Sequence, residues 1–438
     1  MKQSLYTTAP QPECALLIGI ASADDQTASP AMAELARLAQ TAGCDVFATL
    51  VQPRQKPDPK TFLGKGKIAE AAQLVTANEL DLIIADDELT PGQIAAIEAA
   101  AGCKVIDRTT LILDIFARHA STREGKLQVE LAQQRYRLSH LKGLGQVLSR
   151  TGGGIGTRGP GEKKLETDRR HIHRQIDRLQ RQLDQLAQTS AIRAQRRRRS
   201  GVRAVSLVGY TNAGKSTLFN RLTSAAVHTR DAPFVTLDTT TRRINPEYGH
   251  CLLSDTVGFI DKLPHELIRA FRATLAAAAD ADLLLHVVDA SDPRAAENIA
   301  VVERVLEEIG AIHLPRLLVY NKIDRLPPDI RAAVMARCSR ADTFAISAKT
   351  GEGLGPLAAA MIETLSAQDR IRSYLLPYRD GKRLEQLYRH AEILSREDRP
   401  EGIRLTVKIG STFPDTAYRP FLIASDHSDD LEAMHDPL

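Results

Sequence analysis

Short apolar runs alternate with amphipathic stretches over residues 12–112. Residues 14–20, 46–51, 80–85 and 104–106 have the composition of buried strands, and residues 31–41, 66–76 and 91–101 have the spacing of helices. This strand–helix alternation predicts a small parallel sheet. The turn Gly64-Lys65-Gly66-Lys67 would suit an anion at a helix start, so a second nucleotide site in this region stays open.

The apolar pattern then becomes purely helical over residues 109–141, and again from residue 162 onward. The apolar positions of the first stretch are Leu127, Leu131, Leu138 and Leu141, and those of the second are Leu165, Ile172, Ile176, Leu179, Leu183 and Leu186. Seams of this kind predict two helices packed antiparallel as a hairpin. His171 and His173 lie in the second helix without Cys or carboxylate partners and are expected at the surface.

The tip of the predicted hairpin is rich in glycine. Residues 152–161 contain six glycines and Pro160, which neither a helix nor a strand tolerates. Arg150 and Arg158 supply guanidinium groups that can bind phosphate, and glycine permits close approach of the backbone. The tip is therefore suited to being inserted against folded RNA. A flexible linker is the alternative, but a linker does not need a helical hairpin to present it.

Composition indicates ordinary globular material. The chain has 438 residues, 43% hydrophobic and 26% charged, enough for about three domains. Five scattered cysteines, without metal-ligand spacing, favour a reducing compartment and no structural metal. No signal peptide or membrane-spanning apolar run is evident, which predicts a cytoplasmic protein.

Charge is concentrated in the middle of the chain. Residues 121–203 contain 20 Lys and Arg against 7 Asp and Glu, a net charge of +13, whereas the whole chain carries only +4. A basic segment between acidic flanks favours a polyanionic partner such as nucleic acid. A solvated helix face with basic linkers, including Arg196 to Arg199, is the alternative.

Residues 209–216 read Gly-Tyr-Thr-Asn-Ala-Gly-Lys-Ser, a complete phosphate-binding loop. An apolar run at 205–208 precedes it and a helical pattern at 217–222 follows, which is the setting the motif requires. Lys215 would contact the β- and γ-phosphates, and the Ser216 hydroxyl would bind Mg²⁺.

Four further motifs follow in the order that a GTPase requires. In residues 234–238, Thr236 would bind Mg²⁺ and the γ-phosphate. Residues 251–258 read as a strand ending in Asp255-Thr256-Val257-Gly258, where Asp255 would hold Mg²⁺ through water and the Gly258 N–H would bond the γ-phosphate. The motif Asn321-Lys322-Ile323-Asp324 indicates that the base is guanine, because the Asp324 carboxylate can accept both guanine N1–H and N2–H₂. The Ala348 N–H would donate to guanine O6.

The candidate residues are therefore as follows. The catalytic set is Lys215, Thr236 and Gly258, and the metal ligands are Ser216 and Thr236. The nucleotide-binding set is Gly209, Tyr210, Thr211, Asn212, Ala213, Gly214, Lys215, Ser216, Phe234, Val235, Thr236, Leu237, Asp238, Asp255, Thr256, Val257, Gly258, Asn321, Lys322, Ile323, Asp324, Ser347, Ala348 and Lys349.

Two residues bear on mechanism. Phe259 follows Gly258 where many small GTPases have a water-orienting Gln, so intrinsic hydrolysis should be slow. Asn212 stands where some GTPases use Asn to help bind K⁺, which makes K⁺ a candidate cofactor beside GTP and Mg²⁺.

Taken together, the patterns predict a multidomain α/β chain. It would comprise an N-terminal parallel α/β domain (1–112), a basic antiparallel helical hairpin (113–200), a phosphate-loop GTPase domain with a mostly parallel sheet (201–370), and a small C-terminal α+β domain with an acidic tail from residue 425 (371–438).

The chain resembles the HflX family of translational GTPases over nearly its whole length. The matching sequence segments are residues 106–117, 123–133, 152–162 and 255–260, and the last of them includes Phe259. The resemblance implies a GTPase that binds the large ribosomal subunit, brings its hairpin near the peptidyl-transferase region, and splits or rescues stalled ribosomes under stress. His119, and Ser139-His140, depart from the family's usual Arg and Pro-Arg and put local contacts in doubt.

Three hypotheses follow. The first is an enzyme whose hydrolysis is stimulated by the large subunit; the second is a GTP-switched ribosome- or RNA-binding module with incidental turnover. A third, an ATP-driven RNA remodeller, lacks a second phosphate loop. The partners expected are the large ribosomal subunit and its RNA, not DNA; the chain should be monomeric, and loose membrane association stays open.

Overall fold

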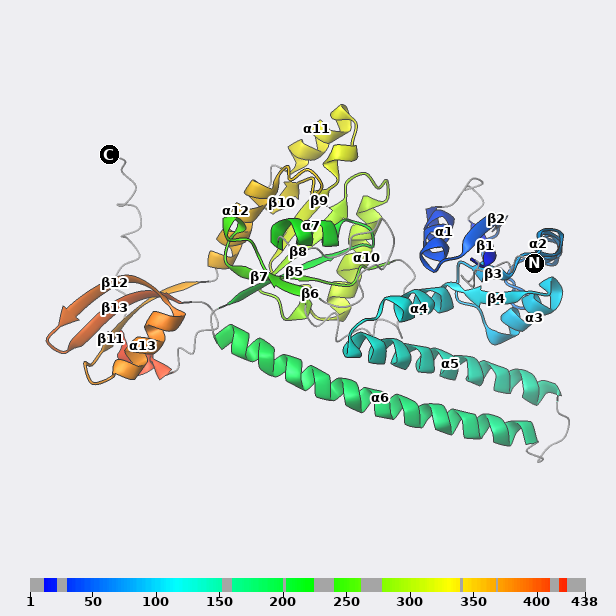
Figure 1. Ribbon diagram of the computed structural model, residues 1–438, viewed down its shortest axis with the longest axis horizontal. Coiled ribbons are helices and arrows are strands. Elements are labelled where there is room, and N and C mark those ends of the chain that lie inside the picture. The colour runs from blue at the N-terminus through cyan, green and yellow to red at the C-terminus, as the bar shows by residue number, and fades with distance from the viewer. Residues whose placement is uncertain are drawn as a thin grey trace, which may run out of the picture.

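The computed structural model describes residues 12–21, 30–151, 160–199, 202–223, 240–260, 278–338, 342–367, 369–409 and 417–423. Four bodies follow one another along the chain (Figure 1): an α/β unit, a long helical hairpin, a larger α/β unit and a small α+β unit. The predicted fold class is confirmed. Within the described residues, no helix has both the length and the apolar character needed to cross a membrane.

The N-terminal unit is a four-stranded parallel sheet in the order β2-β1-β3-β4. Its strands are β1 (Cys14–Ala21), β2 (Asp45–Pro53), β3 (Leu82–Ala85) and β4 (Lys104–Asp107), and its helices are α1 (Pro30–Thr41), α2 (Lys65–Asn78), α3 (Pro91–Ala101) and α4 (Arg108–His119). Local chemistry sets the helix starts. Thr90 and Gln93 form a capping box before Pro91, and Asp107 accepts the backbone N–H of Thr110.

The predicted helix over 109–141 is wrong in one respect, because the chain breaks it into α4 and α5 (Arg123–Thr151). Helix α4 ends at Ala120, and the Thr122 hydroxyl then accepts the backbone N–H of Gly125 to begin α5. Leu111 and Phe116 of α4 are buried in the N-terminal core. The domain boundary expected at residue 112 thus falls inside α4.

Helix α5 packs along α6 (Pro160–Arg199), as the apolar seams predicted (Figure 1). Leu131, Leu179 and Leu183 are buried at their contact. Helix α5 is also fastened to the N-terminal unit, because the Tyr136 hydroxyl donates to Asp107 Oδ2 at 2.7 Å. His171 and His173 are exposed. The glycine-rich tip, 152–159, lies outside the described residues.

The third unit has a six-stranded sheet in the order β10-β9-β8-β5-β7-β6, parallel except for the edge strand β6. Its elements are β5 (Arg203–Gly209), α7 (Lys215–Thr223), β6 (Thr240–Arg243), η1 (Pro246–Tyr248), β7 (Cys251–Asp255), β8 (Leu283–Asp289), α10 (Ala295–Glu308), β9 (Arg316–Asn321), η2 (Ile323–Arg325), α11 (Pro328–Arg337), β10 (Thr343–Ala345) and α12 (Leu354–Ser366). The carboxyl ends of β5, β7, β8 and β9 meet at one edge, where parallel sheets place their ligand sites.

The C-terminal unit is a four-stranded antiparallel sheet in the order β12-β13-β11-β14 with one helix against it. Its elements are β11 (Arg370–Leu376), α13 (Gly381–His390), β12 (Glu392–Arg399), β13 (Gly402–Ile409), η4 (Arg419–Phe421) and β14 (Leu422–Ile423). Tyr374 and Tyr418 fill its core, with ring centroids 5.6 Å apart. The acidic tail from residue 425 lies outside the described residues.

Candidate GTP-binding site

The phosphate loop runs from the end of β5 at Gly209 to the start of α7 at Lys215, as the motif predicted. Gly214 has φ +92°, and a Cβ there would lie 2.3 Å from Asn321 Nδ2. A Cβ on Gly209 would lie 2.2 Å from the Val287 carbonyl oxygen. Both positions therefore require glycine, and Asn212 takes the left-handed conformation between them with φ +61°.

Lys215 lies under this loop and is buried. Its Nζ donates to the carbonyl oxygens of Gly209 at 3.0 Å and Tyr210 at 2.9 Å. Burial lowers the pKa of Lys215 to about 8, against the opposing attraction of Asp255. The loop thus carries a desolvated cation at the place where phosphate charge is expected.

Asp255 ends β7 beside the first turn of α7, and its carboxylate is fully buried. The Ser216 hydroxyl donates to Oδ2 at 2.6 Å, whereas Oδ1 has no hydrogen-bond partner within the described part of the chain. Burial raises the pKa of Asp255. A buried carboxylate oxygen without a donor, beside a hydroxyl, is the oxygen chemistry that Mg²⁺ prefers.

Gly258 and Phe259 lie against the phosphate loop. A Cβ on Gly258 would come within 2.9 Å of Thr211 Cα and 3.0 Å of Lys215 Nζ. The Thr211 N–H donates to the Phe259 carbonyl oxygen at 2.6 Å, and the Phe259 N–H donates to the Gly209 carbonyl oxygen at 3.1 Å. The phenyl ring itself is buried in the cluster that contains Val208. Phe259 is therefore part of the core beneath the loop.

The base-recognition motifs come together at the end of β9. Asn321 Nδ2 donates to the Ala213 carbonyl oxygen at 2.9 Å, which ties this motif to the phosphate loop. The Asp324 carboxylate accepts a hydrogen bond from the Ser347 hydroxyl at 2.6 Å. Because Asp324 is exposed, its carboxylate is still accessible to a base. The Ala348 N–H, the expected donor to guanine O6, donates to Asn321 Oδ1 at 2.9 Å. Contact with O6 would require that bond to be shared or exchanged, and it stays a prediction.

The other candidates divide into three groups. Residues 234–238, with Thr236, lie outside the described residues. Lys322 Nζ pairs with Asp289 at 2.6 Å, and Lys349 is exposed. In the N-terminal unit, the Gly64 N–H already donates to the Gln52 side chain at 2.7 Å, which weakens the case for an anion site at that turn.

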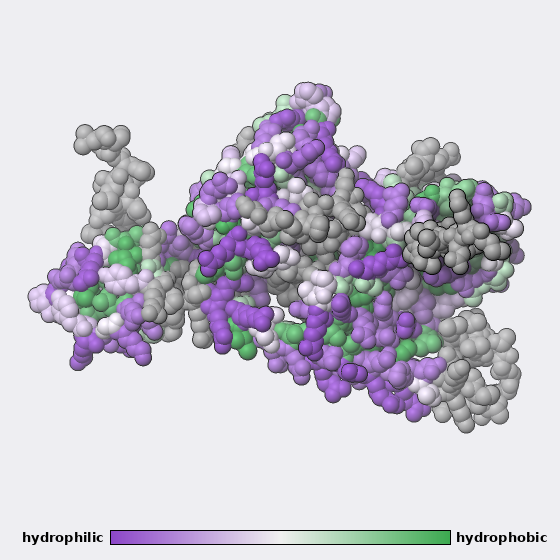
Figure 2. Space-filling model, viewed as in Figure 1, coloured by the Kyte–Doolittle hydropathy of each residue, from purple (hydrophilic) through white to green (hydrophobic). Residues whose placement is uncertain are grey.

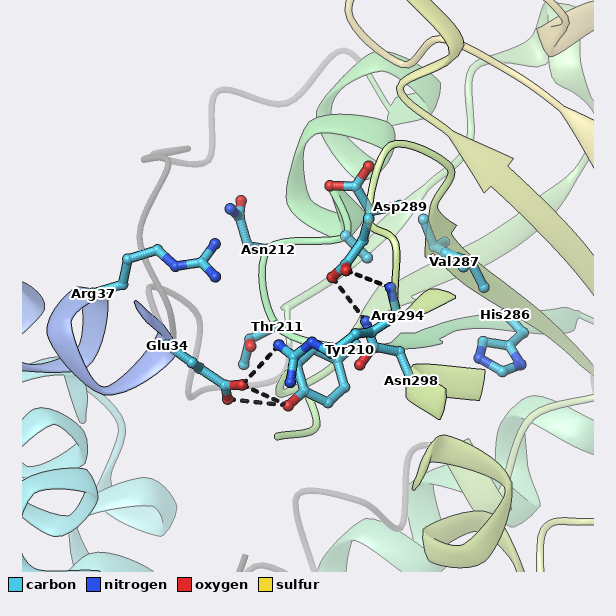
Figure 3. A pocket seen from close by; sticks show the side chains of 13 residues that line it. Glu34, Arg37, Tyr210, Thr211, Asn212, His286, Val287, Asp289, Arg294 and Asn298 are labelled. Carbon is cyan, nitrogen blue, oxygen red and sulfur yellow. Dashed lines mark hydrogen bonds and ion pairs between the residues drawn. The ribbon is translucent and has the colours of Figure 1, made fainter. Parts of the chain in front are cut away.

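Glu34 and Arg294, which no sequence motif singled out, lie beside the phosphate loop (Figure 3). Glu34 reaches from α1 to the Tyr210 hydroxyl and to Arg294, and these residues line a cavity of 40 Å³ together with His286. Burial lowers the pKa of His286 to about 3, so the imidazole is neutral. Neither His286 nitrogen has a hydrogen-bond partner among the described residues. The cavity is large enough for about one or two water molecules.

Three family models match consecutive parts of the chain. A model described as GTP-binding GTPase N-terminal covers residues 29–117, and one described as GTP-binding GTPase Middle Region covers 119–198. A third, described as 50S ribosome-binding GTPase, covers residues 204–322, which include the phosphate loop and Asn321.

Relatives match over most of their length. GTPase HflX of Caldanaerobacter subterraneus subsp. tengcongensis is 44% identical over 400 residues, 91% of each chain. GTPase HflX of Escherichia coli is 45% identical over 356 residues, 81% of this chain and 84% of that protein. A solved GTP-binding protein from Sulfolobus solfataricus, in complex with GDP, is 25% identical with a TM-score of 0.43 and covers 80% of this chain and 98% of that one.

Proposed function

The chain belongs to the HflX family of GTPases, and we propose that it binds the large ribosomal subunit and splits or rescues stalled ribosomes under stress. In this proposal GTP binding favours the ribosome-bound form, and hydrolysis stimulated by the subunit permits release. The family model described as 50S ribosome-binding GTPase supports the choice of partner.

The position of Phe259 carries the proposal. The chain is a GTPase, yet the residue after Gly258 is Phe259, which is only 2% exposed and lies beneath the phosphate loop. Two backbone hydrogen bonds fix its main chain there. The ring has no polar atom with which to orient a water molecule, and turning it toward the nucleotide would take it out of the apolar cluster that buries it. Efficient hydrolysis therefore needs a group supplied from elsewhere, and a partner that supplies it controls the reaction.

A surface suited to RNA lies along α6. Arg170, Arg174, Arg178 and Arg181 are exposed and follow one another at helical spacing, so they form a stripe on one face. The buried residues Leu179 and Leu183 lie on the opposite face, against α5. The outer side of α6 is correspondingly hydrophilic in Figure 2. Guanidinium groups about 6 Å apart along a helix suit successive backbone phosphates.

Mg²⁺ is the metal that the site fits. Ser216 Oγ would hold it, directly or through water, together with Asp255 Oδ1, which has no hydrogen-bond partner among the residues that the structure describes. The ion would neutralise charge on the β- and γ-phosphates. Thr236, predicted as the second protein ligand, completes this proposal.

Steady-state GTP hydrolysis with and without purified large subunits tests the proposal. We expect a stimulation of at least about tenfold, since groups supplied in trans accelerate other GTPases by far more. Sedimentation with subunits should show binding with a GTP analogue and weak binding with GDP. Replacing Arg174, Arg178 and Arg181 by Gln should weaken binding and reduce its dependence on salt concentration. Binding without nucleotide preference would contradict the proposal.

A GTP-switched binding module with incidental turnover is the second candidate, and slow hydrolysis with a buried Phe259 is compatible with it as well. It predicts the same nucleotide-dependent sedimentation without any stimulation of hydrolysis. The hydrolysis measurement therefore separates the two candidates.

A further inference from the structure

Glu34 joins the N-terminal unit to the phosphate loop. Its side chain is 4% exposed, and its carboxylate accepts hydrogen bonds from three residues. The Tyr210 hydroxyl lies 3.0 and 3.1 Å from its two oxygens, Arg294 Nη2 lies 3.3 Å from Oε2, and Arg108 Nη2 lies 2.9 Å from Oε1. Tyr210 and Arg294 belong to the GTPase unit, so a single carboxylate bonds both units (Figure 3).

Positively charged groups of both units lie against Glu34. Arg108 pairs with Glu34 and also with Asp86, at 2.7 Å, within the N-terminal unit. Arg294 supplies a positive charge from the other unit. A buried carboxylate is costly unless it is paired, so undocking must rehydrate Glu34 or leave it short of a partner.

Apolar contacts bind the same two surfaces. Tyr210, Val257 and Ile260 are buried in one cluster with residues of the N-terminal core such as Leu35 and Phe116. Tyr210 is part of the phosphate loop, and Val257 and Ile260 flank the segment Gly258–Phe259. The N-terminal unit thus packs directly on the two loops that would contact the β- and γ-phosphates.

A short path connects Glu34 to the charge that binds phosphate. The Tyr210 side chain is held by Glu34, whereas the Tyr210 backbone carbonyl accepts from Lys215 Nζ at 2.9 Å. Displacement of Tyr210 therefore removes one of the two acceptors that fix Lys215, and it also moves Thr211, which bonds Phe259.

We propose that Glu34 is a positioning residue of the GTP site. Through the Tyr210 hydroxyl it holds the phosphate loop and Lys215 in the form that receives phosphate, so nucleotide affinity and docking of the N-terminal unit are coupled. Linkage makes the coupling reciprocal: bound nucleotide stabilises the docked N-terminal unit. The inference rests on GTP binding at this loop and adds its regulation from outside the GTPase unit.

Tyr210→Phe in the full chain is the first test, because it removes one hydroxyl and keeps the ring in its apolar contacts. Titration with fluorescent GDP and a GTP analogue should show dissociation constants raised about 5- to 30-fold, within the range of measured couplings between sites. The number of binding sites per chain should stay at one. A merely structural defect would instead lower the number of sites and leave the dissociation constant unchanged.

Glu34→Gln is the second test, and it should raise the dissociation constant at least as much. In the Glu34→Gln background, Tyr210→Phe should raise the dissociation constant less than it does in the parent chain, because the amide still accepts the hydroxyl but without the charge that strengthens the bond. Glu98→Gln is the matched control. This carboxylate lies in α3 and accepts a hydrogen bond from the Val105 N–H, so among the described residues its hydrogen bond stays within the N-terminal unit. Its dissociation constant should equal that of the parent chain.

Hydrogen exchange supplies the reciprocal measurement. Nucleotide should slow exchange of α1 amides in the parent chain, and this protection should be lost in Tyr210→Phe. Unchanged dissociation constants in both variants, or effects that multiply in the double variant, overturn the inference. A parent chain that fails to bind guanine nucleotide would overturn the site assignment itself, which the parent titration reports separately.

Discussion

Nucleotide binding should take up a proton at mildly alkaline pH, because Lys215 is buried and burial disfavours its charged form. Burial lowers its pKa to about 8, and its neighbours are two carbonyl oxygens at 3.0 and 2.9 Å. At pH 8.5 roughly three quarters of such amines are neutral. Phosphate oxygens favour the ammonium form, so binding must raise the pKa and draw a proton from solution.

The sign fixes the pH dependence of affinity. The bound state holds more protons than the free protein above pH 8, so affinity should fall as pH rises, by at most about tenfold per pH unit. Below pH 7 both states are protonated at Lys215, and this contribution disappears. Calorimetric titration with GDP at pH 8.5, in two buffers of different ionisation enthalpy, measures the uptake, which should be about 0.7 proton.

Lys215→Met provides the control, because it keeps an unbranched side chain in the buried position and has no group to titrate. Its proton uptake should fall close to zero although it binds nucleotide more weakly. Guanine N1 stays largely protonated at pH 8.5 and adds little. Equal heats in the two buffers for the parent chain would refute the reasoning, since Lys215 would then be fully charged before phosphate arrives.

Four further outcomes are expected from the site. Asp324→Asn should weaken GTP binding about 10- to 100-fold, the worth of charge-assisted hydrogen bonds, and admit xanthosine triphosphate; an unchanged preference for guanine would contradict the assignment. Gly258→Ala should abolish the difference between GTP and GDP in ribosome binding, since its Cβ would lie 2.9 Å from the Thr211 backbone, closer than carbon contacts allow. If sedimentation with ribosomal subunits still depends on the nucleotide, this segment does not sense the γ-phosphate. If Asn212 helps to bind K⁺, hydrolysis should be faster in KCl than in NaCl at equal ionic strength, and equal rates would exclude that role. Shortening residues 152–161 should leave basal hydrolysis intact and abolish stimulation by the large subunit; stimulation that persists would mean the tip is only a linker.

Local patterns predicted the elements well, because each depends on its own residues. The helix expected over 91–101 coincides with α3, where Thr90, Pro91 and Gly102 mark both ends. The break between α4 and α5 was missed although Ser121 and Thr122 carry a start signal, since the apolar period continues across it. Hydroxyl residues within an apolar pattern are common, and only the Thr122–Gly125 bond shows that this one begins a helix.

The contact between units was beyond the reach of the sequence. Glu34 and Arg294 are 260 positions apart, and each looks like an ordinary charge on an amphipathic helix or a polar loop. Tyr210 occupies a variable position of the phosphate-loop motif, so the motif says nothing about its hydroxyl. The pairing arises only in the folded chain, where Arg108, just after β4, pairs with Asp86, just after β3, and with Glu34, which reaches that loop at Tyr210.

The buried position of Phe259 links hydrolysis to the rest of the molecule. Its backbone bonds to Gly209 and Thr211 make the segment after Gly258 a continuation of the phosphate loop, and Ile260 then enters the N-terminal core. A small GTPase with Gln at this position can reorient that side chain alone. Here a movement of the backbone at Phe259 must break those two hydrogen bonds or be accompanied by a movement of the N-terminal unit. A movement caused by loss of the γ-phosphate would then be transmitted to the N-terminal unit, which also holds α5 through Tyr136. A partner bound along the hairpin and the nucleotide would therefore act on the same connected part of the molecule.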